Sequence, residues 1–222
     1  MLRAQCRSAR PLAADCGLMM RKPTTHLLYL HGFRSSPQSA KARRVAAWVH
    51  EHRPDLHWWC PQLPPSPREA LALVLAGVAD WPVEGMAVIG SSLGGFYATA
   101  VAERLGCPAV LLNPAVDPAR DLEKYIGEQT AWHDPAERFY FRAEFVGELR
   151  AMTPATITRP ERYFAVIAKG DEVLDWQEMA ARYTGCRIKL LEGSDHALSD
   201  FEDHLDGIVE FAGLVNPSAS SR

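Results

Sequence analysis

The feature that most constrains the fold of this chain is a short glycine-rich segment, Gly90 to Gly95, with the sequence GSSLGG. An apolar run typical of a buried strand precedes it, and Leu93 to Leu105, with apolar residues at helical spacing, follows it. The order Gly-x-Ser-x-Gly between a strand and a helix predicts a sharp turn with Ser92 at its tip. Glycines at positions 90 and 94 suit this turn, because side chains there would collide with the neighbouring strand and helix. Ser92 is therefore a candidate nucleophile.

A glycine-rich loop has two other common uses, which are to turn the chain without any chemistry and to cradle a phosphate. Phosphate loops carry Gly-x-x-x-x-Gly-Lys-Ser/Thr or Gly-x-Gly-x-x-Gly, and the segment matches neither pattern. The pattern around Ser92 thus favours nucleophilic chemistry over phosphate binding.

A serine nucleophile needs a base, and the base needs an acid that orients it. Two later strand-like runs, 162–168 and 187–191, end in loops that carry such groups, with Asp171 after the first and His196 after the second. The carboxyl ends of parallel strands meet at one edge of a sheet, where open α/β sheets place their ligands. We therefore predict that Ser92, Asp171 and His196 converge at this edge.

Other side chains compete for these roles. Asp175 is the nearest rival for the acid, but its position before the segment 176–183 is typical of a helix N-cap. Asp195 is expected to shape the loop beside His196, and His204 to face solvent from the last helix. His133 stays open as an alternative, because it lies in a segment expected to overhang the site. No pair of histidines has a zinc-binding spacing with a carboxylate, so no metal is expected.

A tetrahedral intermediate also needs hydrogen-bond donors for its oxyanion. The backbone N–H of Leu93, the residue after the nucleophile, is the first candidate. The second is the N–H of Phe33, in the loop after the apolar run 27–30, where Gly32 allows a close approach of the backbone. His31 is expected to brace this loop.

Several motifs occur in a linked order along the chain. They are YLHGF at 29–33, SSP at 35–37, SxKA at 39–42, IGSSLGGFYAT at 89–99, LNPAV at 112–116, GDEVLD at 170–175 and DH at 195–196. Together they resemble the bacterial YqiA-type esterase family, over nearly all of the segment 26–211. The resemblance implies an α/β-hydrolase fold and hydrolysis of carboxylic esters or thioesters. Carried over by position, it implies Ser92 as nucleophile, Asp171 as acid and His196 as base.

The chain alternates strand-like and helix-like runs, which predicts about six mostly parallel strands with helices on both faces. The alternation breaks between positions 113 and 160, after the strand-like run that ends at Leu112. We expect a small cap at 121–160 that binds substrate through Phe139, Tyr140 and Phe141. The alternative, that these aromatic residues pack a connecting helix, stays open.

Composition bounds the remaining properties. A chain of 222 residues with 47% hydrophobic residues can form one domain, expected at 24–215, with a disordered extension at 1–23 and a flexible tail at 216–222. The net charge of -3 gives no electrostatic footprint for nucleic acid. No apolar run approaches the ~18 residues of a membrane span. Five scattered cysteines suggest a reducing compartment, so a cytoplasmic location is expected.

These features predict a serine hydrolase that cleaves a small-molecule acyl ester or thioester through an acyl-enzyme, with no cofactor. The same three side chains also serve amidases and peptidases, so that alternative stays open. A non-catalytic binding scaffold is less favoured, because binding alone does not require serine, aspartate and histidine together.

Overall fold

The computed structural model describes residues 22–132, 134 and 136–215. Nearly all of the predicted extension at 1–23, the tail at 216–222 and the candidate His133 lie outside the described residues. The described part is built around one sheet whose six strands are all parallel, in the order β2-β1-β3-β4-β7-β8. The strands are β1 (His26–Leu30), β2 (His57–Trp59), β3 (Met86–Ser91), β4 (Ala109–Leu112), β7 (Tyr163–Ala168) and β8 (Arg187–Leu191). The predicted α/β architecture is confirmed.

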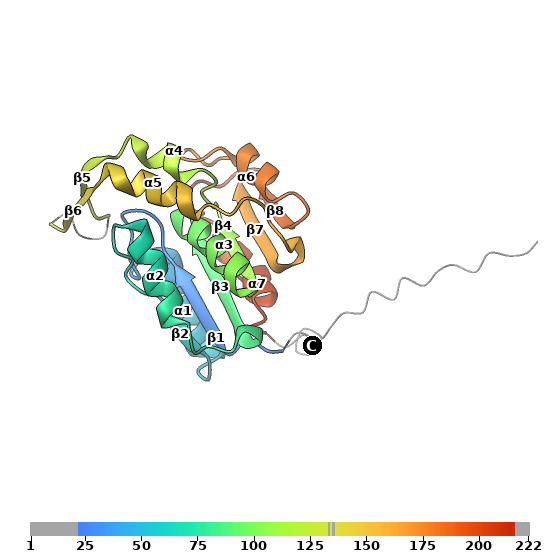
Figure 1. The fold of residues 1–222 in the computed structure, drawn as a ribbon. Coiled ribbons are helices and arrows are strands. Elements are labelled where there is room, and N and C mark those ends of the chain that lie inside the picture. Colours follow the sequence, from blue (N-terminus) through green and yellow to red (C-terminus); the bar gives the residue numbers. More distant parts are fainter. Residues whose placement is uncertain (1–21, 133, 135, 216–222) are drawn as a thin grey trace, which may run out of the picture.

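Helices cover both faces of this sheet (Figure 1). One face packs against α1 (Ala40–His52) and α7 (Glu202–Phe211), and the other against α2 (Pro67–Gly77), α3 (Leu93–Leu105) and α6 (Trp176–Arg182). All six residues of β7 are buried, and their side chains alternate between the two apolar clusters. A continuous apolar run is what a strand covered on both faces requires.

The crossover between β4 and β7 carries an inserted unit where the alternation of the sequence breaks. It consists of α4 (Pro118–Glu123), an antiparallel hairpin of β5 (Gly127–Thr130) and β6 (Arg138–Phe141), and α5 (Ala143–Met152). Figure 1 shows these elements gathered across one end of the sheet, with the hairpin projecting beyond it. We call the segment 118–152 the cap. Its hairpin was not predicted from the sequence.

The prediction that His204 faces solvent is wrong. Its imidazole is buried against β8, where Lys189 Nζ donates a hydrogen bond to Nδ1 at 2.9 Å. The opposite ring nitrogen, Nε2, lies 3.1 Å from the Asp200 carboxylate. The helix turns this position toward the sheet, and the two polar neighbours satisfy both ring nitrogens there.

Candidate active site

Ser92 occupies the tip of the turn between β3 and α3, with φ of 56° and ψ of −120°. This left-handed conformation is strained for a serine and is fixed by close packing around the turn. A Cβ atom on Gly90 would lie 2.2 Å from the carbonyl oxygen of Gly94, and one on Gly94 would lie 1.9 Å from the carbonyl oxygen of Leu30. Only glycine fits at either position, which is why the sequence pattern locates the turn.

The structure brings Ser92, His196 and Asp171 together into one hydrogen-bonded row. His196 Nε2 lies 3.1 Å from Ser92 Oγ, and His196 Nδ1 lies 2.8 Å from Asp171 Oδ2. A carboxylate only accepts hydrogen bonds, so Nδ1 carries the proton and Nε2 faces the serine as an acceptor. The row can therefore move a proton from the hydroxyl to the imidazole.

Asp171 is held in a fixed orientation. Its side chain is 0% exposed, and Oδ1 accepts hydrogen bonds from the backbone N–H groups of Val173 and Leu174, each at 2.8 Å. Oδ2 is thereby left to face His196. The rival carboxylate, Asp175, accepts a hydrogen bond from Gln177 N at 2.8 Å and caps α6, as its sequence position predicted.

Asn113, which the sequence analysis did not single out, positions the loop that carries His196. Its side chain is fully buried, and Nδ2 donates to the carbonyl oxygens of Asp195 and His196 at 2.9 and 3.2 Å. Its Oδ1 accepts from the backbone N–H of Ala168, at the end of β7, at 2.8 Å. The residue has a φ of 42°, a conformation in which asparagine is enriched. One amide side chain thus joins the ends of β4 and β7 to the histidine loop.

Two further side chains hold the same loop from its outer side. Lys41 Nζ, from α1, donates to the carbonyl oxygen of Ala197, and Glu172 accepts from the backbone N–H of His196 at 3.0 Å. Burial lowers the pKa of Lys41 to about 8, against the opposing effect of the Asp195 and Asp171 carboxylates. Asp195 itself accepts from the N–H and the hydroxyl of Ser199, so it shapes the loop as expected.

The amides of Phe33 and Leu93, predicted to receive the oxyanion, form no hydrogen bonds with other described residues. Gly32 packs directly against Ser92, since a Cβ atom on Gly32 would lie 3.3 Å from Ser92 Cβ. His31 braces the loop as predicted, because its Nε2 accepts from the N–H of Leu63 at 3.1 Å. Two unused donors therefore lie in the backbone beside Ser92.

The cap holds the Phe33 loop through aromatic contacts. The Phe33 ring centroid lies 5.6 Å from that of Tyr125, 5.9 Å from that of Phe139 and 5.3 Å from that of Phe141. Such spacings are typical of favourable edge-to-face and tilted aromatic pairs. The loop after β1 is thus packed against the inserted unit rather than exposed to solvent.

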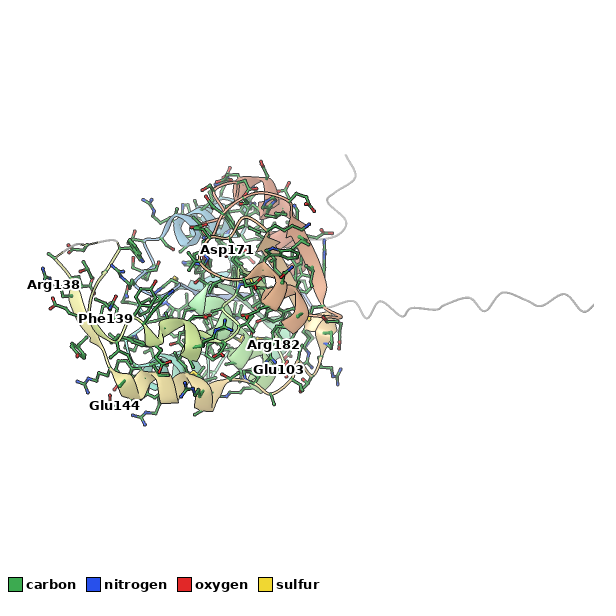
Figure 2. The ribbon with its side chains drawn as sticks, turned by 90° about the horizontal axis from the view of Figure 1, so that it is seen from above. Glu103, Arg138, Phe139, Glu144, Asp171 and Arg182 are labelled. Atoms are coloured by element: carbon green, nitrogen blue, oxygen red, sulfur yellow. The ribbon has the colours of Figure 1, made fainter. Side chains whose placement is uncertain are left out.

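The three aromatic residues predicted to bind substrate do not share one environment. Phe139 and Phe141 line a cavity of about 540 Å³ beside the Phe33 loop. Tyr140 lies between them on β6 and points to the other side, where its side chain is 61% exposed. Successive strand residues alternate in direction, so one hairpin strand cannot aim all three into one cavity. Figure 2 shows Phe139 on the hairpin at one end of the molecule and Asp171 on the loop after β7.

A smaller cavity of about 190 Å³ opens directly onto Ser92 and His196. Within residues 22–132, 134 and 136–215, no group of three or more His, Cys, Asp or Glu side chains is arranged to hold a metal ion. In the same ranges, the helices are too short or too polar to cross a membrane.

Solved structures with the same fold include several hydrolases. They are alpha/beta hydrolase domain-containing protein 10 from mouse, Est1E from Butyrivibrio proteoclasticus with ferulic acid bound, and the esterase domain of a Rhodothermus marinus protein. Their sequence identities are 17%, 16% and 20%, and their TM-scores are 0.62, 0.61 and 0.56. The matches cover 85%, 86% and 88% of this chain, and 91%, 87% and 86% of theirs. These similarities establish the α/β-hydrolase fold.

The family model that matches this sequence covers residues 26–213 and is described as Uncharacterised protein family (UPF0227). This range includes every motif on which the resemblance to YqiA-type proteins rested. The chain therefore belongs to this family.

Proposed function

We propose that the protein hydrolyses carboxylic esters or thioesters of small molecules through an acyl-enzyme formed on Ser92. The observation that carries the proposal is the row Ser92 Oγ, His196, Asp171 with its separations of 3.1 and 2.8 Å. Hydrogen-bonded groups in this order activate a serine, because the imidazole removes the hydroxyl proton as the oxygen attacks.

In the first half-reaction, Ser92 Oγ attacks the substrate carbonyl carbon while His196 Nε2 takes the hydroxyl proton. The carbonyl oxygen becomes an oxyanion and accepts hydrogen bonds from the N–H groups of Leu93 and Phe33. His196 then donates its proton to the leaving oxygen or sulfur, and the bond from that atom to the carbonyl carbon breaks. Asp171 keeps the imidazole oriented and stabilises its protonated form.

In the second half-reaction, water replaces the alcohol or thiol. His196 takes a proton from the water as its oxygen attacks the acyl-enzyme carbonyl, and returns that proton to Ser92 Oγ when the acid leaves. In this proposal Phe139 and Phe141 contact the acyl group. We propose that all of these residues belong to one domain at 24–215.

Two observations support the chemical class and the compartment. The Rhodothermus marinus structure, which shares the fold, is described as an esterase domain, and the Est1E structure of the same fold has ferulic acid bound. Cys60 and Cys186 are free thiols, which favours a reducing compartment such as the cytoplasm.

The test combines covalent labelling with turnover. Wild-type protein should react with a fluorophosphonate at Ser92, located by peptide mass spectrometry, and should release p-nitrophenol from short acyl esters. A protein that folds but shows neither labelling nor turnover is a binding scaffold, which would refute the proposal. Faster cleavage of matched p-nitroanilides than of the esters would indicate an amidase instead.

A further inference from the structure

The two cavities beside Ser92 share one wall. Phe33, Arg34 and Leu93 line both the 190 Å³ cavity and the 540 Å³ cavity. Ser92 and His196 line only the smaller one, whereas Gly32, which packs against Ser92, lines the larger one. The larger cavity therefore begins at Gly32 and Leu93, which adjoin Ser92, and His196 is not among its lining residues.

In the proposed reaction, different parts of the substrate lie on different sides of Ser92. His196 must reach the leaving atom to protonate it, so the leaving group lies on the histidine side. The oxyanion lies at the Leu93 and Phe33 amides. The third substituent of the tetrahedral carbon, the acyl chain, must then extend past these two residues and away from His196. That direction leads into the larger cavity.

The walls of the larger cavity suit an apolar chain. Seven of its side chains are large and hydrophobic or aromatic, and they are Phe33, Leu63, Leu73, Leu93, Tyr97, Phe139 and Phe141. Its volume falls within the range of small-molecule sites, about 300 to 1,000 Å³. Glu69 also lines it and disfavours a carboxylate at the far end of a substrate, whereas the cation of this lining, Arg34, is engaged with Thr130 and Trp132.

Leu73 gives independent support for this assignment. It lies on α2, and its side chain is 41% exposed, although the core-facing Ala70, Leu71 and Val74 of the same helix are buried. An exposed leucine at the wall of a cavity acquires an apolar partner when a hydrocarbon chain enters.

We infer, on the basis of the proposed function, that the larger cavity is the acyl site. It takes an uncharged, apolar acyl chain that runs past Leu93 and Phe33 toward Leu73, and the smaller cavity takes the leaving group.

The experiment compares two substrate series in three variants. One series is p-nitrophenyl esters from acetyl to decanoyl, and the other is acetate esters of alcohols of increasing size. Leu73→Trp fills the larger cavity, and Val173→Trp fills the smaller one, which Val173 lines. Ala76→Trp is the matched control, because it adds the same ring to an exposed position of the same helix that lines neither cavity.

In the wild type, kcat/KM should rise about fourfold per added acyl methylene until the cavity is full. Leu73→Trp should lower kcat/KM for the octanoyl ester at least tenfold relative to the acetyl ester, and Ala76→Trp should keep the wild-type profile. Val173→Trp should instead weaken selection among the acetate esters. The mono-p-nitrophenyl ester of octanedioic acid, which carries a carboxylate at its far end, should be a poorer substrate than the octanoyl ester.

The inference is overturned if Val173→Trp shortens the preferred acyl chain and Leu73→Trp does not, since the acyl chain then occupies the smaller cavity while ester hydrolysis stands. If Leu73→Trp fails to fold, Leu73→Ser should flatten the same acyl-length profile, and an unchanged profile would also overturn the inference. Absence of turnover and labelling in the wild type would refute the proposed function itself.

Discussion

The guanidinium of Arg34 lies over the indole ring of Trp132, with its central carbon 4.2 Å from the ring centroid. Two hydrogen bonds join the same segments, since Arg34 Nε donates to the carbonyl oxygen of Thr130 at 2.6 Å and Trp132 N donates to the carbonyl oxygen of Arg34 at 2.7 Å. Arg34 is also held at a φ of 59°. Arg34, which follows Phe33, is therefore held against the end of the cap hairpin. The cap thus stabilises the loop that carries the proposed oxyanion donor, the N–H of Phe33.

Replacing Arg34 tests this support. Arg34→Met should lower kcat by about tenfold with little change in KM, because a displaced oxyanion donor costs less than the ~10² or more of a deleted one. Arg34→Lys should recover little, since an ammonium lacks the planar fork that stacks and donates together. Arg138→Met is the control, because Arg138 pairs with Glu128 on the exposed surface of the same hairpin. A rise in KM with unchanged kcat would show that Arg34 acts only on substrate binding and does not support the oxyanion donor.

Ser92→Ala should reduce ester turnover by roughly 10⁶-fold, the cost of removing the nucleophile of such a triad. Covalent labelling should disappear, while the melting temperature should change little. Ser91→Ala is the internal control, because Ser91 is the buried last residue of β3, whereas the hydroxyl beside His196 Nε2 is that of Ser92. Full activity in Ser92→Ala together with loss in Ser91→Ala would move the nucleophile to position 91.

Asparagine substitutions of the two aspartates in the loop after β7 should have different effects. Asp171→Asn should lower kcat by about 10⁴-fold with a folded protein, because the amide no longer holds the required tautomer of His196. Asp175→Asn should cost about 1 kcal/mol or less of unfolding free energy, as expected for a helix cap, with turnover nearly intact. Denaturant melts and steady-state kinetics on both variants measure the difference. A larger catalytic loss at Asp175 would assign the acid to that residue.

Three neighbouring residues of β6 provide a graded test of the cap. Phe139→Ala should flatten the dependence of kcat/KM on acyl length, by about 0.8 kcal/mol for each methylene that loses its contact. Phe141→Ala should also lower the unfolding free energy by about 3 to 5 kcal/mol, because this ring is fully buried. Tyr140→Ala should alter neither property. If all three variants kept the wild-type profile and lost only stability, these aromatic residues would be packing residues.

Because of Lys41, the free energy of unfolding of the protein should rise with pH. Burial lowers its pKa in the folded state to about 8 from an ordinary value of 10.5, so the folded state binds fewer protons than the unfolded state between these values. The destabilising effect of the buried charge is complete below about pH 8 and is lost as the pH rises to 10.5. The melting temperature of the wild type relative to Lys41→Met should therefore increase from pH 7.5 to pH 10. A constant difference would show that the lysine is effectively solvated.

The sequence was sufficient for features that depend on local constraints. The turn at Ser92 could be located because Gly90 and Gly94 leave no room for a side chain, and the four central strands because their apolar runs are buried on both faces. Contacts between distant segments could not be found this way. The roles of Asn113 and Arg34, the buried position of His204 and the outward direction of Tyr140 all depend on the spatial arrangement of separate elements. Resemblance to a family identified the motif around Asn113 without its contacts.

The order of the strands places the proposed catalytic residues in regions that differ in local stability. Ser92 follows β3, a central strand, whereas His196 follows β8, an edge strand whose residues are mostly exposed or half-buried. Edges and loops open at lower free energies than the centre of a domain. We expect fraying at this edge to move His196 away from Ser92, which stays in place. Activity should then be lost at a lower temperature than the one at which the sheet melts.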